Sequence, residues 1–324
     1  MKKYLIAFLV TTSVFIFLLK FDKEVPGIIG PSSKEVSQPQ EISLITTGDI
    51  GLVRDVNYKI ILEKDSSYPF LKIADYLREA DLTITNLEGP LIKNCPIIRD
   101  GFTFCGEDSN VSGLIYAGID GASLANNHTT NYGLEGLEET VQILNSKGVK
   151  TFGLDEKIEY IQVKDKKIAL IGFVELGNNW GGLSNAIPEN VSTLTSKAKL
   201  NADIVIVSFH WGTEYTYKPT ENQISLGRLA INSGADIVLG NHSHWIQPLE
   251  VYKEKFIIYA QGNTIFDQDW SQETREGVLY KFIYRNGKFE KIDEKFTIID
   301  NNSQPRFATD EESSKIKAKM PSVS

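Results

Sequence analysis

Histidine and cysteine are scarce in this sequence of 324 residues, which contains four histidines and two cysteines. So few cysteines argue against a structural zinc site built from thiolates. Cys95 and Cys105 lie in the stretch "NCPIIRDGFTFC". Outside the cytoplasm such a pair can close a loop, so we expect a disulfide here rather than two free thiols.

The sequence also lacks net positive charge, since its formal net charge is −8 at pH 7. Lys2, Lys3 and Lys20 belong to the first twenty residues, which contain no acid, so the rest of the chain is more acidic still. An acidic body argues against electrostatic capture of nucleic acid or of an anionic membrane surface. An anionic ligand would need a local attraction, which a metal cluster could provide.

One long apolar run is present, and it lies at the N-terminus, "MKKYLIAFLVTTSVFIFLLK". Two lysines followed by an apolar run from Tyr4 to Leu19 are typical of a secretory signal or a signal anchor. No small-x-small cleavage site follows, and the lysines favour a cytoplasmic N-terminus. We predict that residues 1–20 are a signal anchor or signal peptide. The remainder would then be extracytoplasmic, anchored to the cytoplasmic membrane or secreted if the signal is cleaved.

The rest of the chain divides by composition. Residues 21–40 are rich in Pro, Ser, Gly and charge, which predicts a flexible linker. From Glu41, short β-branched runs alternate with helix-like stretches such as "FLKIADYLREA" and "GLEGLEETVQILNSKGV", which predicts an α/β fold with mostly parallel strands at first. Strands without helices follow, with Asn286-Gly287 as a hairpin turn. We predict a single large domain over 41–300 and a polar, poorly ordered tail over 301–324.

Five of the apolar strands end in a carboxylate, an amide or an imidazole. These strands read "ISLITTGD", "DLTITNLE", "GASLANNH", "DIVIVSFH" and "DIVLGNHSH". The carboxyl ends of parallel strands lie side by side, and ligands bind there. Taken singly, Asp49 could belong to a turn and Asn127 to a helix cap. Together, five strand ends that use all four histidines favour one common site.

The chemistry of this set is that of metal binding, because imidazole and carboxylate suit Zn²⁺, Mn²⁺ or Fe²⁺. The set exceeds what one four-coordinate ion needs. It fits two divalent transition-metal ions ~3.5–4 Å apart that share a carboxylate, an arrangement common in hydrolytic phosphatases. The predicted metal ligands are Asp49, Glu88, Asn127, His210, His242 and His244. Two such ions would attract an anionic substrate despite the acidic surface.

Six stretches occur in order: "TTGDIGLVRDV", "TNLEGPL", "LANNHTTNYG", "FHWGTEY", "GNHSHWIQPLE" and "IYAQGNTIFDQ". Together they resemble the CapA family, the capsule or poly-γ-glutamate biosynthesis proteins of bacteria, which is itself similar to the calcineurin-like metallophosphoesterases. The resemblance runs from about Ile42 to Asp267. It implies a calcineurin-like metallophosphoesterase fold, in which two β-sheets pack face to face, helices flank them, and the metal site lies at the sheet edge.

The resemblance also implies roles for the site residues. Asp49 matches the first metal-binding aspartate, and Glu88 matches the bridging carboxylate. Asn127 matches a ligand, His210 and His242 complete one metal, and His244 reaches the other. The implied catalytic residues are His128, as a general acid near the leaving group, and Arg54, which would orient an anionic substrate. For Arg54 the alternative is a surface arginine that follows a strand.

Three positions depart from the family pattern. The Asp-x-His motif has Gly51 at its third position, and Asn131 stands where relatives often keep an acid after the Asn-His pair. The usual "GHHPH" is here "GNHSH", which retains both ligand histidines. Metal binding is therefore better supported than catalysis.

Two functions remain open at this stage. The first is a metal-dependent hydrolase of capsule or envelope polymer biosynthesis, in which a dinuclear metal-bound hydroxide cleaves a phosphoester, or an amide or ester of an anionic polymer. The second is a non-catalytic, metal-binding envelope component that assists capsule synthesis or export membrane proteins, which Gly51 and Asn131 favour. A conventional secreted phosphatase would need a fuller ligand set.

Overall fold

The computed structural model describes residues 40–176 and 181–321. The predicted signal segment, residues 1–20, lies outside this range, and so does the predicted linker apart from Gln40. Within the described residues, no helix combines the length and the apolar character needed to cross a bilayer.

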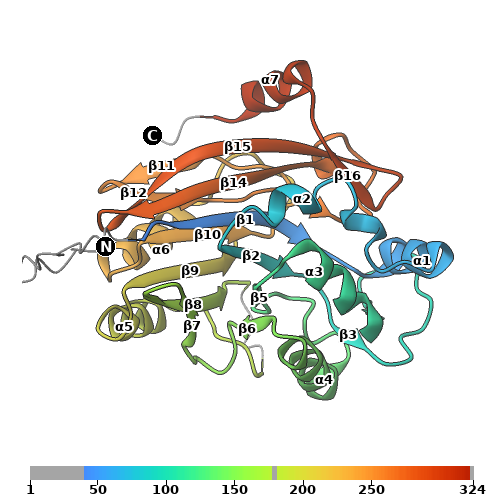
Figure 1. Cartoon of the computed structure of the whole chain (residues 1–324), viewed down its shortest axis with the longest axis horizontal. Coiled ribbons are helices and arrows are strands. Elements are labelled where there is room, and N and C mark those ends of the chain that lie inside the picture. Colours follow the sequence, from blue (N-terminus) through green and yellow to red (C-terminus); the bar gives the residue numbers. More distant parts are fainter. Residues whose placement is uncertain (1–39, 177–180, 322–324) are drawn as a thin grey trace, which may run out of the picture. The chain divides into compact units, whose positions relative to one another are not determined.

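The first of two large sheets contains strands from both the beginning and the end of the domain. It contains eight strands in the order β16-β15-β14-β1-β2-β5-β6, and β13 also pairs with β1. Their bounds are β1 Ile42–Ile50, β2 Leu82–Leu87, β5 Gly121–Ser123, β6 Lys150–Phe152, β13 Asn263–Ile265, β14 Glu276–Arg285, β15 Lys288–Asp300 and β16 Gln304–Phe307. Strands β1, β2, β5 and β6 are parallel, and β14 runs antiparallel to β1. Figure 1 shows β1, in blue, between β2 and the orange β14.

The second sheet contains six strands in the order β11-β12-β10-β9-β8-β7. Their bounds are β7 Glu159–Val163, β8 Lys166–Val174, β9 Ile204–His210, β10 Ile237–Asn241, β11 Leu249–Tyr252 and β12 Lys255–Ile258. Strands β8, β9, β10 and β12 are parallel. The short strands β3 Leu91–Ile92 and β4 Gly106–Glu107 form a separate pair.

Helices cover the outer faces of both sheets. Those near the first sheet are α1 Arg54–Glu63, α2 Ala74–Leu77, α3 Val111–Ala117 and α4 Gly133–Ser146, and those on the second sheet are α5 Pro188–Lys199 and α6 Glu221–Asn232. Short 3-10 turns are η1 Tyr68–Phe70, η2 Asp108–Asn110 and η3 Glu273–Arg275. Leu44 belongs to the core shared by the two sheets, and its neighbour Ile45 belongs to the core under the helices, as alternation along a strand requires. The predicted α/β fold of two packed sheets flanked by helices is confirmed.

Two local predictions differ from the structure. Helix α1 was not predicted, because Val53 at its N-cap provides no side-chain oxygen to mark the start. The stretch "FLKIADYLREA" was predicted as a helix, yet it forms only the end of η1, a turn and the four-residue α2.

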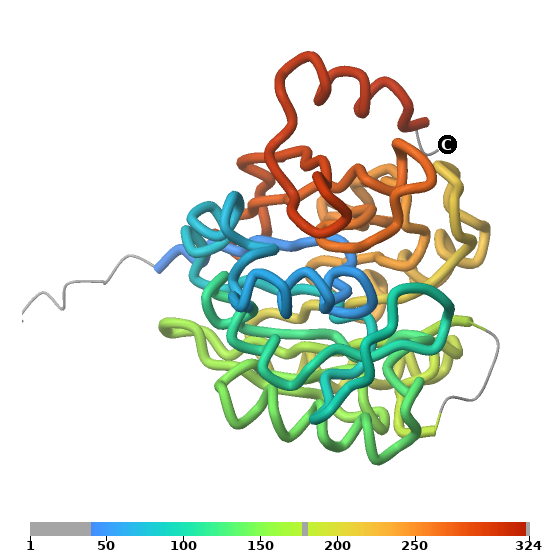
Figure 2. Tube along the Cα trace, turned by 90° about the vertical axis from the view of Figure 1, so that its right-hand side faces the viewer, coloured from blue at the N-terminus to red at the C-terminus, as the bar shows by residue number. Residues whose placement is uncertain are grey.

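The prediction of a poorly ordered tail from residue 301 is wrong for residues 304–319. Strand β16 extends the first sheet, and α7 Asp310–Lys319 follows it. Thr309 and Glu312 form a capping box at the start of α7, and the buried side chain of Ile316 joins the core between the sheets. Figure 2 shows this red helix above the orange and red strands. The folded domain therefore continues past the predicted boundary at residue 300.

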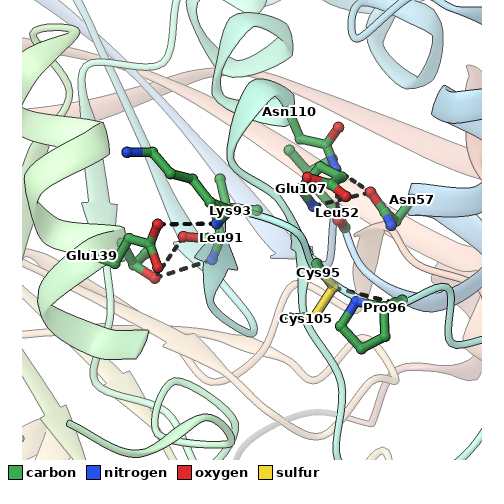
Figure 3. The surroundings of a disulfide bond; sticks show 11 residues. Leu52, Asn57, Leu91, Lys93, Cys95, Pro96, Cys105, Glu107, Asn110 and Glu139 are labelled. Carbon is green, nitrogen blue, oxygen red and sulfur yellow. Dashed lines mark hydrogen bonds between the residues drawn. A yellow bond between two sulfur atoms is a disulfide. The ribbon is translucent and has the colours of Figure 1, made fainter. Parts of the chain in front are cut away.

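The predicted disulfide between Cys95 and Cys105 is confirmed, with the two Cα atoms 6.0 Å apart (Figure 3). It closes the loop that connects β3 to β4. Two carbonyls of this loop accept hydrogen bonds from distant side chains, Gly101 O from Arg54 and Phe102 O from Asn131. The disulfide thus constrains a loop that contacts two residues of the predicted site region.

Replacing both cysteines by serine is expected to lower the free energy of unfolding by about 3 kcal/mol, because the unfolded chain regains the freedom of the closed loop. Urea unfolding of the full chain measures this change. Reduced wild-type protein should unfold at the same urea concentration as the variant. A variant as stable as the oxidised wild type would contradict the expectation.

Candidate metal centre

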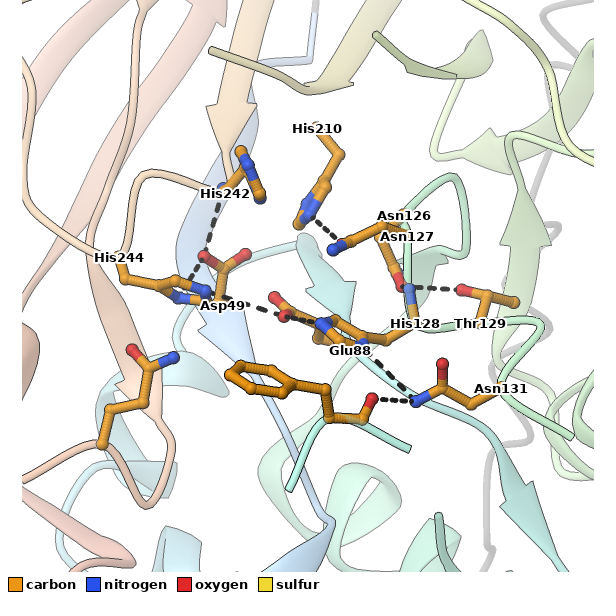
Figure 4. Close-up of polar contacts among 12 residues, drawn as sticks. Asp49, Glu88, Asn126, Asn127, His128, Thr129, Asn131, His210, His242 and His244 are labelled. Atoms are coloured by element: carbon orange, nitrogen blue, oxygen red, sulfur yellow. Dashed lines mark hydrogen bonds and ion pairs between the residues drawn. The ribbon is translucent and has the colours of Figure 1, made fainter. Parts of the chain in front are cut away.

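The six predicted metal ligands and His128 meet at one edge of the molecule, where strands of both sheets end (Figure 4). Asp49 and Glu88 come from the first sheet, and His210, His242 and His244 from the second. These five side chains are almost completely buried, with at most 5% of the surface exposed. Asn127 lies half-buried in the loop after β5. The predicted convergence of the strand ends is therefore observed.

Asp49 is positioned by a close approach of two strands. A Cβ at Gly48 would lie 2.1 Å from Gly262 O, so only glycine lets the chain before β13 pass this close to β1. The Asp49 carboxylate then accepts hydrogen bonds from Asn86 Nδ2 at 2.7 Å and from the backbone N–H of His242 at 3.2 Å. The aspartate thereby links the two sheets at the site.

Glu88 follows β2 and lies in the middle of the cluster. Its Oε1 is 3.8 Å from His128 Nε2 and 3.8 Å from His244 Nε2. Its Oε2 is buried and has no hydrogen-bond partner among the described residues. Two ligands that each lie ~2.1 Å from one ion are separated by up to ~4 Å, so these spacings suit an ion between Glu88 and a histidine better than a hydrogen bond.

His210 ends β9 and faces Asn127. The distance from its Nε2 to Asn127 Oδ1 is 2.9 Å, and its Nδ1 lies 3.4 Å from Asn86 Nδ2. Ligands ~2.1 Å from one ion and at right angles to each other are ~3 Å apart. The 2.9 Å separation is that of a hydrogen bond, and it also matches the spacing of two ligands of the same ion.

His242 and His244 occupy a strained turn directly after β10. Their φ angles are 99° and 55°, in the left-handed region where a residue other than glycine costs about 1–3 kcal/mol. His242 Nδ1 is buried and has no hydrogen-bond partner among the described residues. Strain of this kind is concentrated at functional sites in proteins, which supports a role for both side chains beyond packing.

Asn263 sets the orientation of the His244 ring. Its amide group donates to Thr274 O and Gln268 Oε1, so its Oδ1 is the atom that faces His244 Nδ1, at 2.9 Å. Nδ1 therefore carries the proton, and Nε2 keeps its lone pair for a metal. Histidines that bind a metal through one ring nitrogen usually donate a hydrogen bond from the other nitrogen in this way.

Burial shifts the pKa values of the carboxylates and of the histidines of the cluster in opposite directions. It raises the pKa of Asp49 to about 7, and burial together with the charges of Asp49 and Glu214 raises the pKa of Glu88 well above its ordinary value. Burial lowers the pKa of His242 to about 3 and of His244 to about 4. The imidazoles are therefore neutral at pH 7, as ligands must be, while burial favours the protonated form of the carboxylates unless a cation is bound beside them.

His128 stacks on Phe104, with ring centroids 4.3 Å apart. Its Nδ1 lies 3.2 Å from the amide nitrogen of Asn131, which also donates to Phe102 O, so Nδ1 is an acceptor. Burial, with a smaller effect of the Arg54 charge, lowers the pKa of His128 to about 4. Its role as a general acid stays a prediction, and Asn131 leaves Nδ1 without the carboxylate partner that would favour protonation.

Arg54 is buried, which contradicts the alternative of a surface arginine. Its Nε lies 3.0 and 3.1 Å from the two carboxylate oxygens of Asp267, and it donates to Gly101 O. The guanidinium lies 4.8 Å from the ring centre of Phe104 and 5.3 Å from that of Phe266. The arginine therefore joins three segments around the site, and its contact with a substrate stays a prediction.

The structure adds residues that the sequence did not single out. The carboxylate of Glu214, in the loop after β9, groups with His242 and His244 so that the ligand atoms lie within 4.8 Å of one another, and Asp49, Glu88 and His210 form a second such group. The only local signal for Glu214 is an acid shortly after the strand-end histidine in "FHWGTEY".

Asn126 donates hydrogen bonds to Asn86 Oδ1 and Leu87 O across the site, and its own Oδ1 accepts one from the backbone N–H of His128. The amide of Asn126 thereby ties the loop after β5 to the end of β2.

Two packed sheets, with carboxylates and imidazoles gathered at their strand ends, define a protein with the calcineurin-like metallophosphoesterase fold. The family model of bacterial capsule synthesis proteins, PGA_cap, matches residues 43–268, and the chain belongs to this family. The resemblance to CapA proteins noted in the sequence is thereby confirmed.

Two relatives from bacilli are similar over most of the chain. The PGA biosynthesis protein CapA of Bacillus subtilis is 31% identical over 268 residues, which cover 77% of this chain and 70% of the relative. The capsule biosynthesis protein CapA of Bacillus anthracis is 29% identical over 268 residues, which cover 76% of this chain. The match spans 65% of that protein's own length, slightly less than two thirds.

Solved structures support the fold. A hypothetical protein from Thermus thermophilus superposes with a TM-score of 0.52 at 14% identity, covering 82% of this chain and 99% of its own. A novel phosphatase of Mycoplasma pneumoniae superposes with a TM-score of 0.51 at 14% identity, covering 80% of this chain and 94% of its own. At this level of identity the likeness concerns the fold alone.

Proposed function

We propose that this chain is an extracytoplasmic, metal-dependent hydrolase that acts in the biosynthesis of a capsule or another anionic envelope polymer. The observation that carries the proposal is the buried cluster itself. It holds neutral imidazoles, buried carboxylates with raised pKa values, and two buried ligand atoms, Glu88 Oε2 and His242 Nδ1, without hydrogen-bond partners among the described residues. Burying such atoms is costly unless a cation joins them.

The residues present fit two divalent transition-metal ions. The proposed ligands are Asp49, Glu88, Asn127, His210, His242 and His244, which provide oxygen and nitrogen donors of the kind that Mn²⁺, Zn²⁺ or Fe²⁺ accept. Ions held there would act as Lewis acids, making water more acidic and offsetting the charge of an anionic substrate. Asn263 and Asn86 would fix the orientation of the ligands.

The proposed substrate is a phosphoester, or an amide or ester within an anionic polymer such as poly-γ-glutamate. Support comes from the names of the two relatives from Bacillus species, a capsule biosynthesis protein and a PGA biosynthesis protein. An extracytoplasmic location, with an N-terminal anchor and capsule synthesis or export proteins as membrane partners, belongs to the same proposal. The Cys95–Cys105 disulfide supports it, because disulfides persist in oxidising compartments.

Two further residues, His128 and Arg54, would act on the substrate. His128 is half-buried beside Glu88 and would exchange a proton with the leaving group through Nε2, while Asn131 and Phe104 hold its ring. Arg54 contributes a positive charge close to Glu88 and His128 and would favour the binding of an anionic substrate.

One observation favours the second candidate, a metal-binding envelope component without catalysis. The side chain that contacts His128 Nδ1 is an amide, Asn131, so the imidazole has no carboxylate on that nitrogen to support a positive charge. In this alternative the metal site binds polymer or stabilises the fold, while membrane partners synthesise and export the chain.

Activity with and without metal distinguishes the two candidates. The Mn²⁺-loaded full chain is expected to hydrolyse p-nitrophenyl phosphate or poly-γ-glutamate at a rate that falls more than about 100-fold after chelation and returns when Mn²⁺ is added. Product release measured against time gives the rate. The variant Asp49→Asn should be inactive under all three conditions. Protein that binds metal yet hydrolyses neither substrate would support the non-catalytic alternative.

A further inference from the structure

Glu214 approaches the cluster from a loop that contributes none of the six predicted ligands. Its carboxylate lies with the ring nitrogens of His242 and His244 so that the three ligand atoms are within 4.8 Å of one another. The side chain is half-buried, whereas both histidines are almost fully buried. Glu214 is therefore the one member of this group that reaches toward solvent.

The loop that carries Glu214 is fastened to the turn that carries the histidines. Trp211 N donates to Asn241 O at 3.2 Å, and Tyr215 N donates to Ser243 O at 2.8 Å. The Tyr215 ring also stacks against His244, with centroids 6.0 Å apart. These contacts lie on both sides of Glu214 in the sequence, so backbone hydrogen bonds hold it beside the two imidazoles.

A ligand between these three side chains would relieve two unfavourable features. His242 Nδ1 is buried without a hydrogen-bond partner among the described residues, although a nitrogen of that ring belongs to the group with Glu214. Glu214 also brings a third carboxylate to a cluster that already holds those of Asp49 and Glu88, so three acidic side chains gather here. Arg54, a cation close to them, is already paired with Asp267.

Position 51 offers no alternative ligand beside His244. A Cβ at Gly51 would be 2.7 Å from the ring of Phe266, which itself lies 5.3 Å from the His244 ring. The aromatic ring therefore fills the space that a side chain at position 51 would need. Besides Glu88, whose Oε1 lies 3.8 Å from His244 Nε2, Glu214 is a further oxygen donor within reach of the two histidines.

We propose that Glu214 is a metal ligand, which with His242 and His244 holds one of the two divalent ions. This inference rests on the proposed metal site and deepens it, because it adds a carboxylate from the loop after β9 to the ligand set. It also groups His242 with His244, whereas the family resemblance implied that His242 shares an ion with His210. For an ion held by this group, Glu214 would be the ligand nearest to solvent. Asp49, Glu88 and His210 form the inner group.

Metal stoichiometry of the full chain tests the inference. Metal-free protein is titrated with Mn²⁺ alone, and bound metal is counted by elemental mass spectrometry for wild type, Glu214→Gln and the control Glu221→Gln. Glu221 is an exposed acid in the first turn of α6, so its change alters charge equally without touching the cluster. Two equivalents are expected in wild type and control, and about one in Glu214→Gln, with the second bound at least about tenfold more weakly.

Each outcome separates the inference from the proposed function. Two equivalents of unchanged affinity in Glu214→Gln would overturn the ligand role while leaving the metal site intact. No bound metal in wild type would overturn the proposed function as well. Urea unfolding of metal-free protein provides an independent readout: Glu214→Gln should be as stable as wild type or more so, because repulsion is relieved. A clear loss of stability in the metal-free state would indicate a structural role instead.

Discussion

Replacing both His242 and His244 by alanine is expected to reduce the metal content of the full chain from two equivalents to less than about one. His244 Nε2 faces the central carboxylate of Glu88, and His242 contributes a buried nitrogen without another partner among the described residues. Removing two imidazoles from one cluster should weaken binding by more than about 100-fold, since even the loss of an outer contact weakens metal binding 10–100-fold. Elemental mass spectrometry of the purified proteins measures the content.

The matched control is Glu138→Ala with Gln142→Ala, two exposed positions of α4 outside the cluster. The control should retain two equivalents, and its circular dichroism spectrum should match that of the histidine variant. Full metal content in the histidine variant would exclude the proposed ligand roles. Wild-type protein that takes up neither Mn²⁺ nor Zn²⁺ would leave the family fold without metal chemistry.

Replacing Arg54 by methionine is expected to lower the free energy of unfolding by about 3–5 kcal/mol, because it leaves the carboxylate of Asp267 buried without its partner. The two side chains are 8% and 5% exposed, so solvent screens the pair little. Burial already raises the pKa of Asp267, and Arg54 opposes that rise. Urea unfolding at pH 7 measures the loss.

The double variant Arg54→Met, Asp267→Leu serves as the control. Removing both charges should recover most of the lost stability, because no unpaired carboxylate remains buried. The metal content of Arg54→Met should stay at the wild-type value under native conditions. A single variant that keeps full stability and shows only a raised KM would instead support the predicted substrate role of Arg54.

Local sequence is enough to locate the strand ends and the chemistry placed on them. A strand is recognised from a short apolar run, and Asp49, Glu88, His210 and His242 each stand at the end of one. Parallel pairing brings together the ends of β1 and β2 in one sheet and of β9 and β10 in the other, whereas the packing of the two sheets brings both pairs to one site. The disulfide was also predictable, since two cysteines close in sequence offer one pairing. The family resemblance rests on the same strand-end residues, which explains why it predicted the fold well.

The surroundings of these residues depend on contacts between segments that are far apart in the sequence. The tail beyond residue 300 is polar, yet Ile316 is buried in the core between the sheets, and Phe307, Ala308 and Met320 pack against the cores. So few apolar residues leave no periodic pattern in the sequence. Arg54 looks like an ordinary residue after a strand until Asp267, over two hundred positions later, is placed beside it. Glu214 becomes a neighbour of His242 because the backbone N–H of Tyr215 donates a hydrogen bond to Ser243 O. Such contacts join segments far apart in sequence, and no local pattern of hydrophobicity or propensity records them.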